Sequence, residues 1–283
     1  MVGEFKAPPD KGKTLRFAAA GDPHFGNSGS NNALTRKMLD YIKDPVNDFS
    51  MLFILGDSPH LGFSDALWKE AFGVISSCSS SIPTSYVIGN HDTLFGGLDL
   101  YQDYLCQPLG NDVKGNCLWN RIDNGNIHFI ILDLEWDLSL YTPEQQEWLV
   151  KQLESIPKDD WCIVMSHTFY YCSGSKMEGW IWYDNPGTIE KLVPLFEQYD
   201  VDLVLSGHKH HTEFLQKNGV SYAVVGSFGG PLNPERDYVS PASVWYKAGA
   251  YGFLDVTIEN SAANVLFRDP DGKELFKTTI THR

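Results

Sequence analysis

The 283-residue sequence has no apolar run that approaches the roughly 18 residues needed to span a bilayer as a helix. It has no CxxC pair, so a cysteine zinc site is not indicated. The zincin motif HExxH and the metallo-β-lactamase motif HxHxDH are also missing. The GxSxG elbow of serine hydrolases fails at Gly26–Gly29, because Ser30 occupies the place of the second glycine. These absences exclude several common classes of hydrolase.

Basic residues are few relative to acidic ones. The chain has 22 lysines and arginines against 36 aspartates and glutamates, which gives a formal net charge of −14. A surface of this sign repels nucleic-acid backbones and anionic membranes at long range, so general nucleic-acid binding is not expected. An anionic ligand would need a local reversal of the field, which bound divalent cations provide as the largest local charges in a site.

The five cysteines form an odd set, which is typical of unlinked thiols in a chain of this length. Cys106 and Cys117 flank a short loop with proline and glycine, and could pair in an oxidising compartment. Residues 1–13 are polar and lack the apolar region of a signal peptide, so we expect a flexible N-terminal segment before a single domain over residues 14–283. The five cysteines and the polar N-terminal segment favour an exported or membrane-tethered domain over a cytoplasmic one, which is the alternative.

Short apolar runs stop abruptly at clusters of Gly, Asp, Asn or His. Hydrophobic residues make up 42% of the chain, which is enough for a sizeable core. Near-continuous apolar runs of this length predict strands that helices bury on both faces of a sheet. The runs are Thr14–Ala20, Ser50–Leu55, Ser85–Ile88, Trp161–Met165 and Val201–Leu205.

Helical patterns separate these runs. Asn32 and Ser64 are expected as N-caps, and Thr142–Gln145 has the form of a capping box with proline at the first helical position. The predicted helices are Ala33–Lys43, Asp65–Ser77, Pro143 to about Ser155, and Thr188–Tyr199. After Val220 the pattern changes to mainly antiparallel strands with a hairpin turn at Asp269–Gly272. The predicted strands there are Val220–Gly226, Gly252–Glu259, Ala263–Asp269 and Leu275–Thr281.

The residues after the early strands share one chemistry, because all of them offer oxygen or imidazole donors. In open α/β sheets, ligands collect outside the carboxyl ends of the strands. A single aspartate or asparagine at such a position is typical of a turn, but donors at five separate strand ends indicate a metal site. The absence of thiols favours Mn, Fe, Zn or Co over a structural tetrahedral zinc. The donors are Asp22, His24, Asp57, Asn90, His91, His167, His208 and His210.

These segments, in this order, resemble the motifs of the calcineurin-like metallophosphoesterases. Residues 21–24 read as GDxH, residues 56–57 as GD, residues 89–92 as GNHD, and residues 207–210 as GHxH, with Ser166-His167 as the isolated histidine motif. The resemblance spans residues 21–210, which is most of the chain. It implies an α/β (α+β) four-layer sandwich, in which helices flank two central mixed β-sheets.

The resemblance also implies a ligand set for two transition-metal ions, which would be Mn, Fe or Zn. One metal would be held by Asp22, His24, Asp57 and His210, and the second by Asp57, Asn90, His167 and His208. The Asp57 carboxylate would bridge both metals. His91 is similar to the catalytic histidine of the family, and Asp92 would orient its ring. The implied reaction is hydrolysis of a phosphate monoester or diester by in-line attack of a hydroxide bound to both metals.

Further segments are similar to the purple acid phosphatase branch of this family. They are residues 126–133, 146–149 and 252–254. The chain departs from that branch at the second motif, where His60 stands in place of a tyrosine metal ligand three residues after the bridging aspartate. The tyrosine–iron(III) bond of the branch is therefore not expected. His60 is instead a candidate for a structural role, metal binding or substrate contact.

Substrate specificity is expected in loops near the motif histidines. The segment Thr168–Asp184 is dense in aromatic residues, including Tyr171 and Trp182. These rings either form a wall for the organic group of the substrate or cover core strands. Arg236 and Lys209 are candidate phosphate contacts, and His211 lies either near the mouth of the site or toward solvent.

A second hypothesis is a phosphoesterase fold retained as a protein-binding scaffold with an inactive site. Such a scaffold is expected to lose ligands, typically histidines. This chain keeps every position of the motif set, from Asp22 to His210. The enzyme is therefore the favoured function, and a small-molecule phosphate ester is its expected substrate.

Overall fold

Two mixed β-sheets form the centre of the molecule. The computed structural model describes residues 12–106, 117–177, 180–233 and 235–282. The first sheet, in spatial order, contains β15 (Glu274–Thr281), β14 (Ala262–Arg268), β13 (Phe253–Glu259), β1 (Leu15–Ala20), β2 (Met51–Ile54) and β3 (Thr84–Tyr86). The second contains β12 (Ser243–Lys247), β10 (Thr212–Lys217), β11 (Val220–Val225), β9 (Leu203–Ser206), β6 (Trp161–Ser166), β5 (Ile127–Ile131) and β4 (Asn120–Asn124). A separate hairpin pairs β7 (Ser175–Met177) with β8 (Trp180–Trp182).

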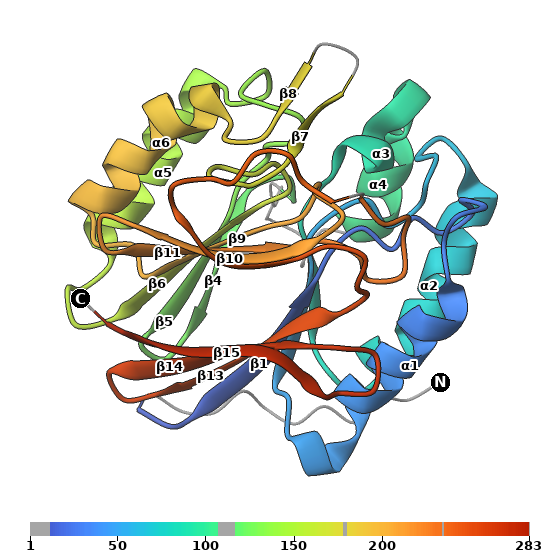
Figure 1. Ribbon diagram of the computed structural model, residues 1–283, viewed down its shortest axis with the longest axis horizontal. Helices are drawn as coiled ribbons and strands as arrows, with labels where there is room; N and C mark the ends of the chain where they lie inside the picture. Colours follow the sequence, from blue (N-terminus) through green and yellow to red (C-terminus); the bar gives the residue numbers. More distant parts are fainter. Residues whose placement is uncertain (1–11, 107–116, 178–179, 234, 283) are drawn as a thin grey trace, which may run out of the picture.

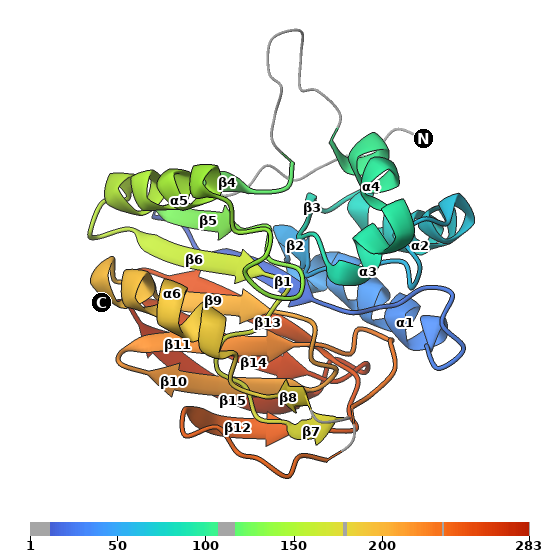
Figure 2. The same cartoon turned by 90° about the horizontal axis from the view of Figure 1, so that it is seen from above.

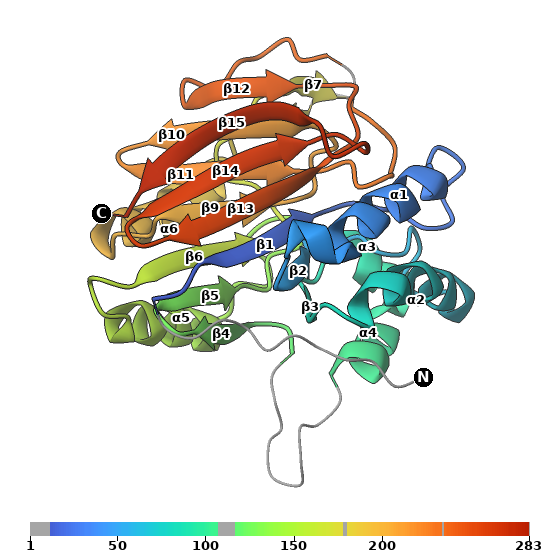
Figure 3. The ribbon, with the colours of Figure 1, turned by 90° about the horizontal axis from the view of Figure 1, so that it is seen from below.

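Helices cover the outer faces of the two sheets (Figure 1). The described helices are α1 (Asn32–Lys43), α2 (Asp65–Ser79), α3 (Asn90–Thr93), α4 (Leu98–Leu105), α5 (Pro143–Ser155) and α6 (Pro186–Gln198), with short 3-10 turns η1 (Pro45–Asn47) and η2 (Leu94–Gly96). α1 and α2 pack on the first sheet, and α5 and α6 on the second (Figures 1 and 3). The predicted four-layer sandwich is confirmed. Within the described part of the chain, no helix has the length and apolar character that a membrane span requires.

The largest apolar cluster lies between the sheets. Phe17, Phe53 and Phe129 meet there, with ring centroids 4.8 to 5.6 Å apart. Successive residues of the central strands alternate between this cluster and the clusters under the helices. In β1, for example, Phe17 faces the other sheet and Ala18 faces α1 and α2. This alternation explains the continuous apolar runs, because both faces of these strands are buried.

The strands that lead into the expected donors run parallel within each sheet. β1, β2 and β3 are mutually parallel neighbours, and so are β5, β6, β9 and β11. Figure 2 shows β5, β6 and β9 pointing the same way, toward the loops beside α3. Parallel strands end at one edge of a sheet, so the loops that follow them meet there.

The predicted boundaries differ from the structure where local caps were misassigned. α1 begins one residue earlier than predicted, so its N-cap is Asn31, whose side chain accepts a hydrogen bond from the Leu34 backbone. α6 begins at Pro186 and is capped by Asn185, because proline suits the first helical turn. The Ser64 cap and the Asp269–Gly272 turn are confirmed.

Apart from the β7–β8 hairpin, which was not predicted either, three polar strands have no counterpart among the predicted elements. They are β4, β10 and β12, which are rich in polar residues, and β4 and β12 form the two edges of the second sheet. An edge strand lacks the continuous apolar signature of a central strand, so periodicity alone does not identify it.

A disulfide joins Cys106 and Cys117, the pair considered from the sequence. The intervening residues 107–116 and the expected flexible N-terminal residues 1–11 lie outside the described residues. The single domain over residues 14–283 remains our proposal for the chain. The other three cysteines are buried free thiols.

A buried ion network links three strands of the first sheet. The Asp255 carboxylate of β13 accepts hydrogen bonds from Arg16 of β1, at 2.9 and 2.8 Å, and from Arg268 of β14, at 2.6 Å. Asp255 is 1% exposed, whereas both arginines retain partial access to solvent. Two guanidinium groups therefore depend on one buried carboxylate.

We predict that Asp255→Ala lowers the free energy of unfolding by about 3 kcal/mol, because it leaves two partly buried cations without their partner. Urea denaturation of both proteins measures the difference. Asp271→Ala is the matched control, because it removes an exposed ion pair with Lys37 and should leave stability nearly unchanged. Equal stability losses in the two variants would contradict this account of the network.

Candidate metal centre

The expected metal ligands all lie on loops at the carboxyl edge of the two sheets. Asp22 and His24 follow β1, and Asp57 follows β2. Asn90 begins α3 beyond β3. His167 follows β6, and the segment 208–210 follows β9. Two sheets therefore contribute to one site, as the positions of the motifs predicted.

The backbone at this edge is strained at the donors themselves. Asp22, His24, Asp57 and His208 have φ angles of 61°, 47°, 56° and 65°. Non-glycine residues rarely adopt this left-handed region, and such outliers cluster at functional sites where the surrounding structure holds them. Hydrogen bonds hold the loops here, including those from Asp22 N to Gly56 O at 3.2 Å and from His24 N to Asp57 O at 3.1 Å.

Two motif glycines allow the loops to approach one another. A Cβ atom on Gly89 would lie 2.4 Å from Asp57 Oδ1 and 2.5 Å from the Asp57 backbone nitrogen. A Cβ atom on Gly56, whose φ is +93°, would lie 2.4 Å from His167 Nδ1. Any side chain at either position would displace a candidate ligand. Close packing of the loops therefore explains why glycine occupies these two positions of the GD and GNHD motifs.

The first group of donors contains Asp22, His24 and His210, beside Asp57. His24 Nε2 lies 3.0 Å from His210 Nε2 and 3.5 Å from Asp57 Oδ2. His210 Nε2 lies 3.4 Å from Asp22 Oδ1. The donor atoms of Asp22, His24 and His210 all lie within 4.8 Å of one another, close enough to hold a single ion.

The second group contains Asn90, His167 and His208, again beside Asp57. His167 Nε2 lies 3.0 Å from Asn90 Oδ1, 3.1 Å from His208 Nδ1 and 3.3 Å from Asp57 Oδ2. The other ring nitrogen, Nδ1, donates to the Leu55 carbonyl at 2.7 Å. Because a carbonyl only accepts, Nδ1 carries a hydrogen, so a metal ion would bind this ring through Nε2.

The electrostatics of these groups fit a bound cation. Burial lowers the pKa of His24 and of His208 well below the usual value, so both imidazoles are neutral, the form in which histidine binds metals. Burial also opposes a proton on His167, yet the Asp57 charge raises the pKa of that ring to about 10. A positive charge is therefore stabilised between His167 and Asp57. The mixed nitrogen and oxygen donors suit transition metals, which would replace that proton.

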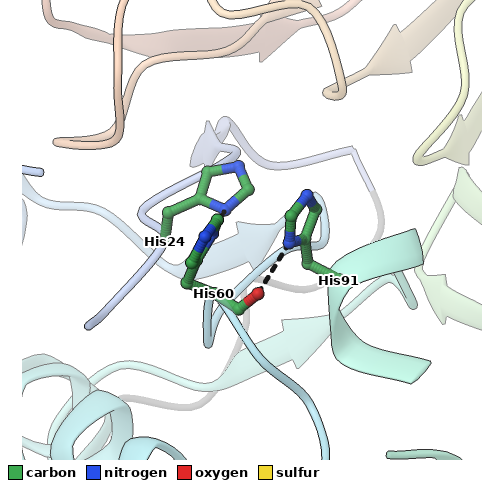
Figure 4. A group of neighbouring side chains, drawn as sticks. All are labelled: His24, His60 and His91. Atoms are coloured by element: carbon green, nitrogen blue, oxygen red, sulfur yellow. Dashed lines mark hydrogen bonds between the residues drawn. The ribbon is translucent and has the colours of Figure 1, made fainter. Parts of the chain in front are cut away.

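His91 faces the first group without being part of it. Its backbone N–H donates to Asp57 Oδ1 at 2.7 Å, and its Nδ1 donates to the His60 carbonyl at 2.6 Å (Figure 4). Its ring lies edge-to-face with that of His24, with 4.6 Å between centroids. The bond to His60 leaves Nε2 of His91 available for proton transfer.

The expected role of Asp92 as the partner of the His91 ring is corrected. The Asp92 carboxylate instead accepts three backbone hydrogen bonds, from Asp57 at 3.0 Å, Ser58 at 2.9 Å and Gly89 at 2.8 Å. The peptide group after His60 orients the imidazole. Asp92 therefore ties the loop of the bridging aspartate to the GNHD turn.

His60 contacts both a candidate ligand and the candidate acid. Its Nδ1 lies 3.3 Å from His24 Nδ1, and its ring stacks on His91 with 4.8 Å between centroids. The Asn27 amide lies 3.2 and 3.3 Å from its two ring nitrogens. Figure 4 shows the three imidazoles grouped together. These contacts favour a supporting role for His60, and substrate binding by it stays a prediction.

The aromatic loop divides between the two expected roles. Tyr171 packs on Tyr222 in the layer beside α6, with ring centroids 5.2 Å apart, so it covers the core. Trp182 lies beside His208, at 5.0 Å between centroids. Sequence reasoning missed Trp136, whose ring lies 5.1 Å from that of His208.

Trp136 follows β5, the strand whose end also carries polar residues. Glu135 beside it is buried and accepts a hydrogen bond from Thr93 of α3 at 2.6 Å. The apolar run Ile127–Leu134 therefore ends at the same edge as the other strands. Applying the strand-end argument to this run as well would have identified the loop.

The other candidate contacts lie elsewhere. Lys209 is 2% exposed, and its ammonium donates to the Trp182 carbonyl at 2.7 Å, so the predicted phosphate contact is corrected. His211 is buried against Glu213, at 3.2 Å, and does not reach the solvent. Arg236 lies over the Tyr246 ring at 3.8 Å, and its contact with phosphate stays a prediction.

Comparison with known sequences agrees with the motifs. The sequence profile described as "Calcineurin-like phosphoesterase" matches residues 15–212. A purple acid phosphatase of Glycine max is 25% identical over 98% of this chain and 59% of its own length. The Fe(3+)-Zn(2+) purple acid phosphatase 12 of Arabidopsis thaliana is 29% identical over 82% of this chain and 50% of its own length. A third relative, from the same plant, is named probable inactive purple acid phosphatase 1 and is 25% identical.

Solved structures share the fold over nearly the whole chain. The yellow lupin purple acid phosphatase PPD1 superposes with a TM-score of 0.80 at 22% identity, covering 98% of this chain and 56% of that one. GAP50, described as the anchor in the inner membrane complex of Plasmodium, gives a TM-score of 0.74 at 20% identity over 95% and 89% of the two chains. The chain spans about half the length of these curated plant relatives, at 59% and 50%.

We predict that Gly89→Ala weakens metal binding about 10–100-fold, because the added methyl group displaces the Asp57 carboxylate. Calorimetric titration of the metal-free protein with Mn²⁺ or Zn²⁺ measures the affinity. Gly73→Ala in α2 is the matched control, because nothing lies within 4 Å of a Cβ atom there. That variant should bind metal like the wild type and gain roughly 0.5–1 kcal/mol of stability. A folded Gly89→Ala protein with normal affinity would contradict the packing argument.

Proposed function

The chain belongs to the calcineurin-like phosphoesterase family, and from this premise we propose that it is a metal-dependent hydrolase of phosphate monoesters or diesters. The proposed reaction is in-line attack of hydroxide on phosphorus. The substrate would be a small-molecule ester, because the net charge of −14 disfavours a nucleic-acid backbone.

The convergence of two donor groups on Asp57 is the observation that carries the proposal. One oxygen of its carboxylate lies 3.5 Å from His24 Nε2 and 3.3 Å from His167 Nε2. A carboxylate shared by two groups of imidazoles suits a pair of metal ions. In our proposal Asp22, His24 and His210 would hold one ion, Asn90, His167 and His208 would hold the other, and Asp57 would serve both.

The donor chemistry limits the metals. Imidazole, carboxylate and amide ligands without thiolates suit Mn, Fe and Zn. The iron–zinc pair named for the Arabidopsis relative supports a mixed centre as one candidate. His60 occupies the place of the tyrosine expected in purple acid phosphatases, so we propose a centre without a tyrosine–iron bond.

Two divalent ions, when bound, lower the pKa of water toward neutrality and neutralise charge on the phosphoryl oxygens. Asp22 and Asp57 offset only about half of that charge. The pocket would therefore attract anionic esters in a protein that is otherwise negative.

His91 is the proposed general acid. Its Nδ1 hydrogen is committed to the His60 carbonyl, so proton transfer to the leaving oxygen would use Nε2. Its backbone bond to Asp57 Oδ1 keeps the imidazole at a constant position relative to the bridging carboxylate. The acid is thus positioned by the same residue that joins the two donor groups.

An inactive scaffold is the second candidate function. One relative is named probable inactive, and GAP50 is described as an anchor. The complete donor set of this chain favours the enzyme, because a scaffold has no need to keep strained, buried donors. Hydrolysis of p-nitrophenyl phosphate after reconstitution with each metal distinguishes the two.

We predict that His91→Ala retains both metal ions but lowers kcat roughly 10²–10⁴-fold, because only the proton donor is lost. Metal analysis and steady-state kinetics on mono- and diester substrates measure the two effects separately.

The exposed Phe95→Ala variant is the matched control, because this residue lies on the neighbouring η2 turn and, among the described residues, its ring packs only against that of Phe63. It should leave kcat unchanged. Full activity of His91→Ala would remove this residue from the mechanism, and loss of metal in that variant would make His91 a ligand instead.

A further inference from the structure

An aromatic corner surrounds the outer side of His208. It consists of Trp136, Trp182 and Phe169, whose ring centroids lie 5.1, 5.0 and 6.0 Å from that of His208. Trp136 and Trp182 are 6.2 Å apart and tilted by 50°. Two indole rings therefore form a wall beside a residue that we have assigned to the metal centre.

The corner is held by hydrogen bonds at its backbone. The Trp136 carbonyl accepts from Thr168 Oγ1 at 2.8 Å, and the Trp182 carbonyl accepts from Lys209 Nζ at 2.7 Å. The buried Lys209 ammonium also lies 5.1 Å from the centre of the Trp182 ring. Trp136 comes from the loop after β5 and Trp182 from β8, so separate segments are fixed to build one surface.

Core packing accounts for part of this corner but not for Trp136. Phe169 is 4% exposed and fills the space behind His208, whereas Trp136 is 48% exposed. An indole that is half in water beside a polar centre loses favourable burial unless a ligand covers it. Because Trp136 lies next to His208, a ligand that covered its indole ring would lie at the site of the proposed reaction.

The corner also includes a buried polar atom of His208. His208 Nδ1 lies 3.1 Å from His167 Nε2, toward the second donor group, whereas Nε2 is buried without a hydrogen-bond partner among the described residues. If Nδ1 binds the ion, Nε2 must carry the ring hydrogen and becomes a donor. His208 is 7% exposed, so this donor is kept from bulk water.

From this geometry we infer that the corner binds an aromatic organic group of the phosphate ester, a class that includes aryl and nucleobase-bearing esters. Flat indole faces favour stacking with a planar ring, and the N–H donors of His208 and the two indoles suit acceptor atoms on or beside that ring. A polyol presents no planar face to stack on the two indole rings. This inference rests on the proposed function, because it takes His208 as a metal ligand.

Binding of phosphonates, which resist hydrolysis, tests the corner independently of turnover. The metal-loaded protein is titrated with phenylphosphonate, hexylphosphonate and methylphosphonate, with binding followed by calorimetry. We expect phenylphosphonate to bind about tenfold more tightly than methylphosphonate in the wild type. This ratio should fall toward one in Trp136→Ala and largely survive in Trp136→Phe, which keeps an aromatic face.

Ile181→Ala is the matched control, because Ile181 is exposed on the same strand as Trp182. It should keep the wild-type ratio. An unchanged ratio in Trp136→Ala, or an equal loss in Ile181→Ala, overturns the inference. Hexylphosphonate binding as tightly as phenylphosphonate overturns the aromatic class and leaves a general apolar site.

Turnover of phenyl phosphate and methyl phosphate separates this inference from the proposed function. Hydrolysis of both esters, with a preference that does not depend on Trp136, supports the enzyme and contradicts the aromatic corner. Phenylphosphonate binding that depends on Trp136, with no hydrolysis of either ester under any metal, supports the corner and contradicts the enzyme.

Discussion

The Asp57 carboxylate connects the two halves of the site, and most local features of the fold serve its position. One oxygen accepts the His91 backbone N–H at 2.7 Å, and the other faces His24 and His167. Gly89 leaves room for this carboxylate, and Asp92 holds the Asp57 peptide from behind. A buried carboxylate is costly unless a positive charge joins it, which is the physical reason to place cations there.

The sandwich explains how such a costly cluster is tolerated. Three apolar layers and the Asp255 ion network stabilise the molecule away from the carboxyl edge. The strained backbone angles at the donors, such as 61° at Asp22 and 65° at His208, are confined to that edge. The stable interior therefore fixes the loops at this edge in backbone conformations that the loops would not keep without it. Trp136 and His60 extend the same edge beyond the motif residues.

Much of the arrangement could be predicted from the sequence, because buried parallel strands and their terminal donors leave strong patterns. The buried strands and the gathering of donors at their ends follow from those patterns, whereas the four layers and the grouping of Asp22 with His210 were implied by the resemblance to the calcineurin-like metallophosphoesterases. Residues that act through tertiary contacts left no comparable signal. Asp92 follows His91 directly in the chain, yet its carboxylate turns to the Asp57 loop instead. Tyr171 and Trp182 belong to one aromatic segment, and only their packing separates core from site.

Anomalous X-ray scattering from crystals grown with Mn²⁺ or Zn²⁺ tests the central claim most directly. The account predicts two ions that share the Asp57 carboxylate, with His24 on one ion, His167 on the other, and His91 bound to neither. A single ion in the site, or an ion held among His24, His60 and His91, which also lie close enough to form a site, would contradict it.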